Sequence, residues 1–140
     1  MAHPREIRRL AFQALFQLDA RAGAEREEIA AALEGAEGFS ERERSEALEL
    51  ALAAFARAGE CDAEMGSLAP AWPAGRQAAV DRAILRLAYH EMLSGAAPPK
   101  VVVNEAVELA KEFSTERSPA FVNALLDKVM RRVASRSAEG

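Results

Sequence analysis

Residues 101–129 read VVVNEAVELAKEFSTERSPAFVNALLDKV, and their apolar side chains recur at the spacing of two amphipathic helices separated by a polar break. Ser118 is expected to cap the second of these helices. Pro119 is expected at its first position, where an amide N–H would have no helical partner. This stretch predicts a helical carboxy-terminal part of the chain.

Working outward from that stretch, the same spacing predicts an all-α fold of about seven helices. The chain has 140 residues, half of them hydrophobic, which suits one core and a single domain over residues 1–140. A breaker cluster, Pro-Ala-Trp-Pro at 70–73, divides the chain into halves of about 1–69 and 76–136. The expected helices span about 5–21, 25–33, 41–59 (capped by Ser40 with Glu43), a short segment before Pro70, 77–93 (ended by Gly95), 101–113 and 118–134.

Composition argues against several kinds of protein. The single Cys61 rules out an intrachain disulfide, and with only His3 and His90 beside it no metal cluster is expected. No apolar run approaches the ~20 residues of a membrane span, and the amino terminus lacks the apolar segment of a secretory signal. We expect a soluble cytoplasmic protein without metal or cofactor.

Charge is unevenly distributed along the chain, although the net charge is −4. Residues 25–64 hold four Arg and twelve Asp and Glu, whereas residues 76–136 hold ten Arg and Lys against seven Asp and Glu. Phosphate binding responds to the local field rather than to the total. The acidic middle is interpreted as a solvated face, and the carboxy-terminal half remains a candidate for nucleic-acid binding.

The first expected helix has two contrasting faces. Its core face carries Ile7, Leu10, Ala11, Ala14 and Leu18, and the opposite face carries Arg5, Arg8, Arg9, Phe12 and Phe16. Guanidinium groups bind phosphates and aromatic rings stack on unpaired bases, so this second face suits RNA. Two alternatives stay open for the phenylalanines: the helix is buried on both sides, or the rings mediate self-association as a homodimer.

The last expected helix repeats this arrangement. Its core stripe is Val122, Leu126, Val129 and Val133, and the adjacent face carries Phe121, Lys128, Arg131 and Arg132, with Arg117 just before the helix. A cationic face with an aromatic ring suits single-stranded RNA better than duplex DNA, since no groove-reading motif is visible. Phe121 is expected to be exposed. The macrodipole alone could explain Arg131 and Arg132 near the helix end.

Polar residues inside the apolar runs are interpreted as structural. They are Glu91, Asn104, Glu105, Asn123 and Asp127, and we expect them to cap and cross-link helices of the second half. No nucleophile–base pair or phosphate-binding glycine loop accompanies them, so no enzymatic activity is expected.

Three ordered motifs resemble the NusB family of bacterial transcription antitermination factors. They are Leu85-Arg86…Ala88…Glu91, Asn104-Glu105-Ala106…Glu108-Leu109-Ala110-Lys111…Phe113, and Phe121-Val122-Asn123…Leu126-Asp127. The resemblance covers residues 5–19 and 76–130. It implies two packed helical bundles. It also implies binding to boxA RNA of ribosomal RNA operons together with the ribosomal protein NusE, in the transcription elongation complex.

The resemblance and the helix faces together indicate candidate site residues. The candidates for RNA binding are Arg5, Arg8, Arg9, Gln13, Arg86, Lys100, Arg117, Phe121 and Lys128, and those for partner binding are Phe12, Phe16 and Asp81. The chain departs from the family pattern at Phe16, where tyrosine is usual, and at Arg117, where an acidic residue is common.

A related domain in ribosomal RNA cytosine methyltransferases provides a further alternative. Those proteins tend to read Asn-Ala-x-Leu-Arg where this chain has Asn123-Ala124-Leu125-Leu126-Asp127. Asp127 favours the free-standing factor, and 140 residues leave no room for a catalytic domain.

Overall fold

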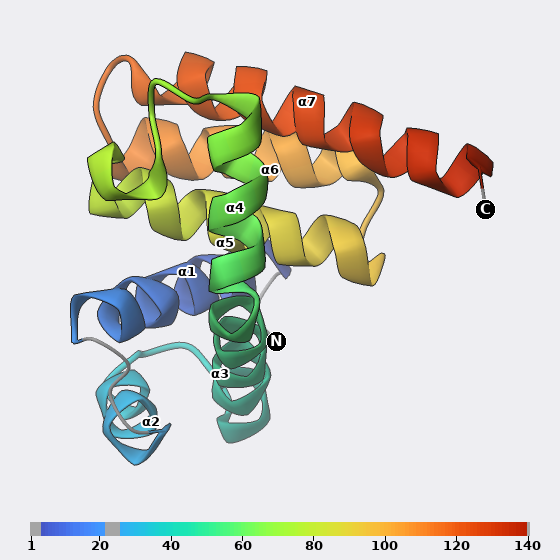
Figure 1. Cartoon of the computed structure of the whole chain (residues 1–140). Helices are drawn as coiled ribbons and strands as arrows, with labels where there is room; N and C mark the ends of the chain where they lie inside the picture. Colours follow the sequence, from blue (N-terminus) through green and yellow to red (C-terminus); the bar gives the residue numbers. More distant parts are fainter. Residues whose placement is uncertain (1–3, 22–25, 140) are drawn as a thin grey trace.

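The structure, a computed structural model, describes residues 4–21 and 26–139, with side chains as far as residue 136. It confirms the all-α class (Figure 1). The elements of this part of the chain are α1 (Pro4–Ala20), α2 (Arg26–Glu34), α3 (Glu41–Ala56), α4 (Ala58–Leu68), the short 3-10 helix η1 (Ala74–Arg76), α5 (Ala79–Ser94), α6 (Pro99–Phe113) and α7 (Ser118–Glu139). None of these helices is long and apolar enough to cross a membrane.

Helix α5 lies at the centre of the molecule. It packs against α1 and α3 on one side and against α6 and α7 on the other, while α4 crosses it at a steep angle (Figure 1). Ten of its sixteen residues are buried, which follows from contact with other helices on most of its circumference. Apolar side chains from all seven α-helices join one hydrophobic core.

Two local sequence signals are confirmed at helix ends. Ser40 and Glu43 form a capping box, in which the Glu43 amide donates to Ser40 Oγ at 3.1 Å and the Ser40 amide to Glu43 Oε1 at 2.8 Å. Gly95 ends α5 with a left-handed φ of +70°, a conformation that glycine adopts without steric cost.

Two expected helix ends are wrong, each for a tertiary reason. Helix α3 ends at Ala56 rather than near Gly59, because the chain starts α4 at once and buries Cys61 and Met65 in the core. Helix α7 continues to Glu139 instead of ending near residue 134. Its added turn is held by Arg136, whose Nη2 lies 3.4 Å from Glu64 Oε1 of α4.

Candidate nucleic-acid interface

Two arginines of α1 bind carboxylates of α5 and α6. Arg8 donates from Nε and Nη2 to Glu91, with 2.7 Å between Nη2 and Oε2, and these side chains are only 15% and 4% exposed. Arg5 donates two bonds of 2.8 Å to Glu105, whose Oε2 also lies 3.9 Å from Arg8 Nη1. Burial lowers the pKa of Arg8, but the hydrogen bonds and the charge of Glu91 outweigh this effect. The net shift of the pKa is upward. Glu91 and Glu105 therefore cross-link helices, as expected. Their partners lie on α1, however, and not in the second half of the chain, where they were expected.

Phe12 is buried, with 3% of its surface exposed, so the expectation that it faces away from the core is wrong. Helix α6 covers this side of α1, and the rings of Phe12 and Phe113 lie 5.1 Å apart. The Arg9 guanidinium lies 5.6 Å from the Phe113 ring centroid and pairs with Glu112. Helix α1 is thus covered on both sides at Phe12, which is one of the alternatives left open by the sequence.

An apolar hollow of about 420 Å³ remains where α1, α5 and α6 meet. It is lined by Phe12, Gln13, Phe16, Gln17, Val80 and Phe113. Phe16 is half-buried and Gln13 is exposed. This hollow is the candidate surface for an apolar side chain of a protein partner.

Arg86 ties three helices together rather than facing solvent. It is 8% exposed and binds Asp62 of α4 and Asp19 of α1, with Nη2–Oδ2 and Nη1–Oδ1 distances of 2.7 and 3.0 Å. Burial lowers the pKa of Arg86, but the two carboxylates outweigh it and the net shift is upward. Asp19 also pairs with Arg82 at 2.6 Å. A guanidinium held in this way supports the packing of α1 and α4 on α5.

Asp81 is also buried, at 8% exposure. Its Oδ1 accepts a hydrogen bond of 2.6 Å from Ser114 and its Oδ2 one of 2.9 Å from Ser118. Ser118, expected to cap α7 from outside, is instead the first residue of that helix and directs its hydroxyl at α5. Asp81 therefore orders the connection between α6 and α7.

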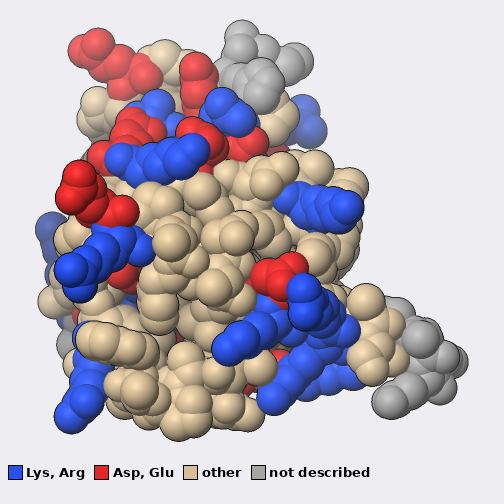
Figure 2. Space-filling view, turned by 90° about the horizontal axis from the view of Figure 1, so that it is seen from above, with Lys and Arg blue, Asp and Glu red and all other residues tan. Residues whose placement is uncertain are grey.

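Three of the exposed cations without ion pairs among the described residues lie on α6, on α7 or in the connection between them; Arg42 of α3 and Arg76 of η1 are two more. Lys100, Arg117 and Lys128 are exposed, and none forms an ion pair with the residues that the structure describes. Arg131 and Arg132 instead pair with Asp127 and Glu64, at 3.0 and 3.3 Å. Figure 2 looks down on α7 and shows Lys and Arg spaced around a broad uncharged area, with acidic groups mostly towards the top of the view.

Trp72 is a further candidate that the sequence does not single out, because the Pro-Ala-Trp-Pro segment predicts only a helix break. It is 55% exposed and lines a hollow of about 370 Å³ with Arg76, Arg117 and Phe121, among others. Phe121 is half-buried against the edge of the core, so the expectation of an exposed ring is wrong. An aromatic residue between two prolines was the available signal, since such a turn tends to lie at the surface.

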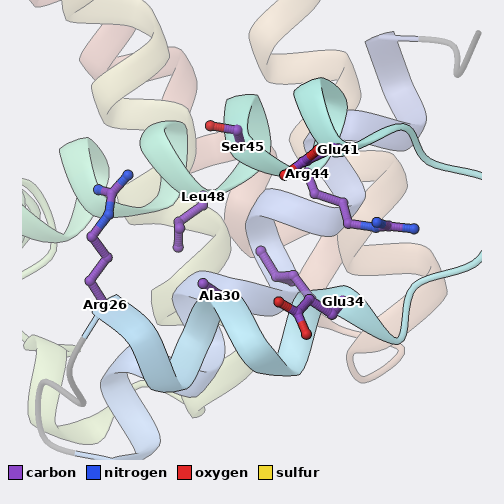
Figure 3. Close-up of a pocket in the computed structure, with 8 residues that line it drawn as sticks. Arg26, Ala30, Glu34, Glu41, Arg44, Ser45 and Leu48 are labelled. Carbon is purple, nitrogen blue, oxygen red and sulfur yellow. The ribbon is translucent and has the colours of Figure 1, made fainter.

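A third hollow, of about 580 Å³, lies between α2 and α3 (Figure 3). Its charged lining residues are Arg26, Glu34, Glu41 and Arg44. Arg44 donates to the Ala36 carbonyl at 3.2 Å and Arg26 pairs with Glu49. This mixture of charges offers no cationic surface for phosphates.

The fold and these surfaces define a small all-α protein in which a central helix is covered on both sides and exposed cations gather near α6 and α7. The profile of the NusB family matches residues 5–131. The chain belongs to the NusB family.

Individual relatives agree with this assignment over most of their length. Transcription antitermination protein NusB of Herpetosiphon aurantiacus is 37% identical over 133 residues, covering 92% of this chain and 90% of its own. The protein of the same name from Symbiobacterium thermophilum is 42% identical over 135 residues, covering 91% and 88%.

Solved structures show the same fold. T. maritima NusB has a TM-score of 0.80 at 30% identity, covering 94% of this chain and 93% of its own. A structure of NusB and NusE in complex with dsRNA has a TM-score of 0.79 at 23% identity, covering 91% and 96%. The resemblance inferred from the three motifs is confirmed.

Proposed function

We propose that this chain is a transcription antitermination factor that binds boxA-type RNA of ribosomal RNA operons together with NusE, in the cytoplasm and without enzymatic activity. Its membership of the NusB family over residues 5–131 carries the proposal. The exposed cations Lys100, Arg117 and Lys128 support it, because cations not held by carboxylates are the ones that phosphates can bind at least cost.

The candidate RNA residues divide into two groups by exposure. Gln13, Lys100, Arg117, Phe121 and Lys128 offer surface to RNA, and Arg5 and Arg9 keep 56% and 41% of their side chains exposed beside their carboxylates. Arg8 and Arg86 are mostly buried in ion pairs. We assign contact roles to the first group and positioning roles to Arg8 and Arg86.

We assign the hollow around Phe16 to NusE rather than to a second copy of the chain. Phe16, Val80 and Phe113 give it an apolar lining. The burial of Phe12 leaves less exposed aromatic surface for self-association than the sequence suggested. Sedimentation of the chain alone tests this choice: a monomer at high concentration agrees with it, and a dimer dissociated by Phe16→Asp contradicts it.

Removing three of the unpaired cations should weaken RNA binding and its dependence on salt. In Lys100→Ala/Arg117→Ala/Lys128→Ala, boxA RNA affinity should fall, because three phosphate contacts are lost. The slope of log affinity against log salt concentration should decrease in magnitude by about 2, at ~0.7 per phosphate of a single strand. Fluorescence anisotropy of labelled RNA at several salt concentrations, with NusE present, measures both.

A control of equal charge removes three exposed arginines elsewhere, in Arg21→Ala/Arg26→Ala/Arg42→Ala, of which Arg21 and Arg26 pair with Glu28 and Glu49. This variant should keep the wild-type slope, so equal losses in the two variants would mean that only overall charge matters. Single-stranded boxA should bind more tightly than the same sequence as a duplex.

Phe121 should contribute both to RNA binding and, less strongly, to folding. Phe121→Ala should cost about 1–3 kcal/mol of RNA affinity if the ring stacks on a base. Because the ring is half-buried, the same change should also lower the free energy of unfolding, by less than the ~3–5 kcal/mol of a fully buried phenylalanine. Phe121→Leu separates the effects, since leucine keeps the apolar contact but cannot stack. Wild-type RNA affinity in Phe121→Leu would rule out stacking.

A further inference from the structure

Trp72 is the single tryptophan of the chain and is 55% exposed. Only one other large hydrophobic side chain among the described residues, Val101, reaches comparable exposure, at 42%. Indole is the largest apolar side chain and binds ligands through its ring face, so an exposed tryptophan suggests a binding role.

The loop that carries Trp72 is held in place by hydrogen bonds. The Trp72 amide donates to the Ala69 carbonyl at 2.9 Å, and Gln77 Nε2 donates to the Trp72 carbonyl at 3.2 Å. Gln77 itself is buried, at 8% exposure. Pro70 and Pro73 restrict the backbone on both sides of the indole.

Arg82 anchors the next turn of the same loop to α1 and α5. Its Nη1 donates to the Ala74 carbonyl at 2.9 Å, and its Nη2 binds Asp19 of α1 at 2.6 Å. A loop held at both ends loses little conformational entropy when its side chains bind a ligand. Trp72 is therefore presented in a preorganised position.

Trp72 and Phe121 line one hollow from different elements, the α4–α5 connection and the first turn of α7. Its volume, about 370 Å³, falls within the ~300–1,000 Å³ of small-ligand sites. Arg76 and Arg117 also line it, are exposed, and form no ion pair with the described residues. Asp81 is the one carboxylate among the described lining residues, and its oxygens face two serine hydroxyls.

We propose that Trp72 and Phe121 hold one unpaired base of a single-stranded RNA in this hollow, while Arg76 and Arg117 bind the phosphates on either side of it. Aromatic faces with neighbouring guanidinium groups match the bases and backbone of an unpaired strand. A base stacked inside a duplex could not enter the hollow. The inference rests on the function proposed above and extends its RNA surface to Trp72 and Arg76 on the α4–α5 connection.

Tryptophan emission gives a direct test, because no other residue of the chain contributes to it. Single-stranded boxA RNA added to the wild-type chain should quench this emission, with the same midpoint as the anisotropy of labelled RNA. Stacking worth ~1–3 kcal/mol corresponds to roughly 5- to 140-fold in affinity. Trp72→Leu should therefore bind the RNA at least fivefold more weakly, and Trp72→Phe should recover most of that loss.

Further variants distinguish the loss of this site from a loss of stability or of overall positive charge. Because Trp72 is exposed, Trp72→Leu should have the melting temperature of the wild type, as measured by circular dichroism. Arg76→Ala should weaken RNA binding more than Arg42→Ala, which removes an exposed arginine from α3, on the other side of α5 from α7 (Figure 1). Abasic nucleotides placed one at a time in boxA should reveal one position whose loss weakens the wild type but not Trp72→Leu.

The outcomes distinguish the inference from the function on which it rests. If the wild type binds boxA with unchanged emission and Trp72→Leu binds equally well, the inference is overturned and the proposed function stands. If Trp72→Leu weakens NusE binding measured without RNA but leaves RNA affinity intact, the hollow belongs to a protein partner and the inference is again overturned. If the wild type binds no boxA even with NusE, the proposed function itself fails.

Discussion

Phe12→Ala should lower the free energy of unfolding by about 4 kcal/mol, within the ~3–5 kcal/mol found when a buried phenylalanine is truncated. The ring is 3% exposed and packs against Phe113, so its removal leaves a cavity between α1 and α6. Apolar surface is lost from the core, and α1 and α6 cannot close together fully because other contacts hold them apart. Urea denaturation monitored by circular dichroism measures the loss.

Phe16→Ala is the matched control, since Phe16 lies one turn further along α1 and is half-buried. It should cost clearly less stability than Phe12→Ala. Equal losses for the two variants would contradict the difference in burial. A cost below ~1 kcal/mol for Phe12→Ala would mean that the ring lies on the surface, as the helix-face pattern first suggested.

Arg8→Met should lower the free energy of unfolding by about 3 kcal/mol, at the lower end of the ~3–5 kcal/mol for breaking a buried ion pair. Methionine keeps most of the apolar stem but leaves Glu91, 3% exposed, as a carboxylate without its charge partner. The cost comes mainly from that stranded charge, not from the lost attraction. The same urea titration measures it.

Two further variants test whether the stability lost in Arg8→Met comes from the unpaired charge of Glu91. Arg9→Met breaks a pair whose side chains are 41% and 45% exposed, and it should cost less than ~1 kcal/mol. The double variant Arg8→Met/Glu91→Leu should recover most of the stability lost in Arg8→Met, because no buried charge is left. If the double variant is no more stable than the single one, Arg8 acts through packing alone.

The helices and some of their caps could be predicted because they depend on neighbouring residues. The capping box of Ser40 and Glu43 and the glycine end of α5 each need only a few consecutive positions. The partners of charged side chains could not be predicted in this way, because they lie far away in the sequence. Arg8 and Glu91, for example, are 83 positions apart. Periodicity shows the direction in which Phe12 points from α1, but not that α6 covers that direction.

The candidate site could be predicted only in part, because sequence patterns identify residue types and helix faces but not burial. The exposed cation Lys128 follows from a helix face, and Lys100, Arg86 and Asp81 follow from the family resemblance. Neither source showed that Arg86 and Asp81 are buried, since burial depends on how α1, α4 and α6 pack around α5. Trp72 lies in a turn without periodicity, and its exposure is a property of the folded loop.

The long separation between α1 and its partners has a consequence for synthesis on the ribosome. Arg5 and its partner Glu105 are 100 positions apart, so the first helix is made well before the helices that cover it. At ~5–20 residues per second, this interval is about 5–20 s. Throughout it, α3 can already pack on α1, but the Phe12 ring lacks the cover that Phe113 of α6 provides and is open to aggregation or to chaperones. The speed of translation through α5 and α6 therefore determines how long the nascent chain remains vulnerable.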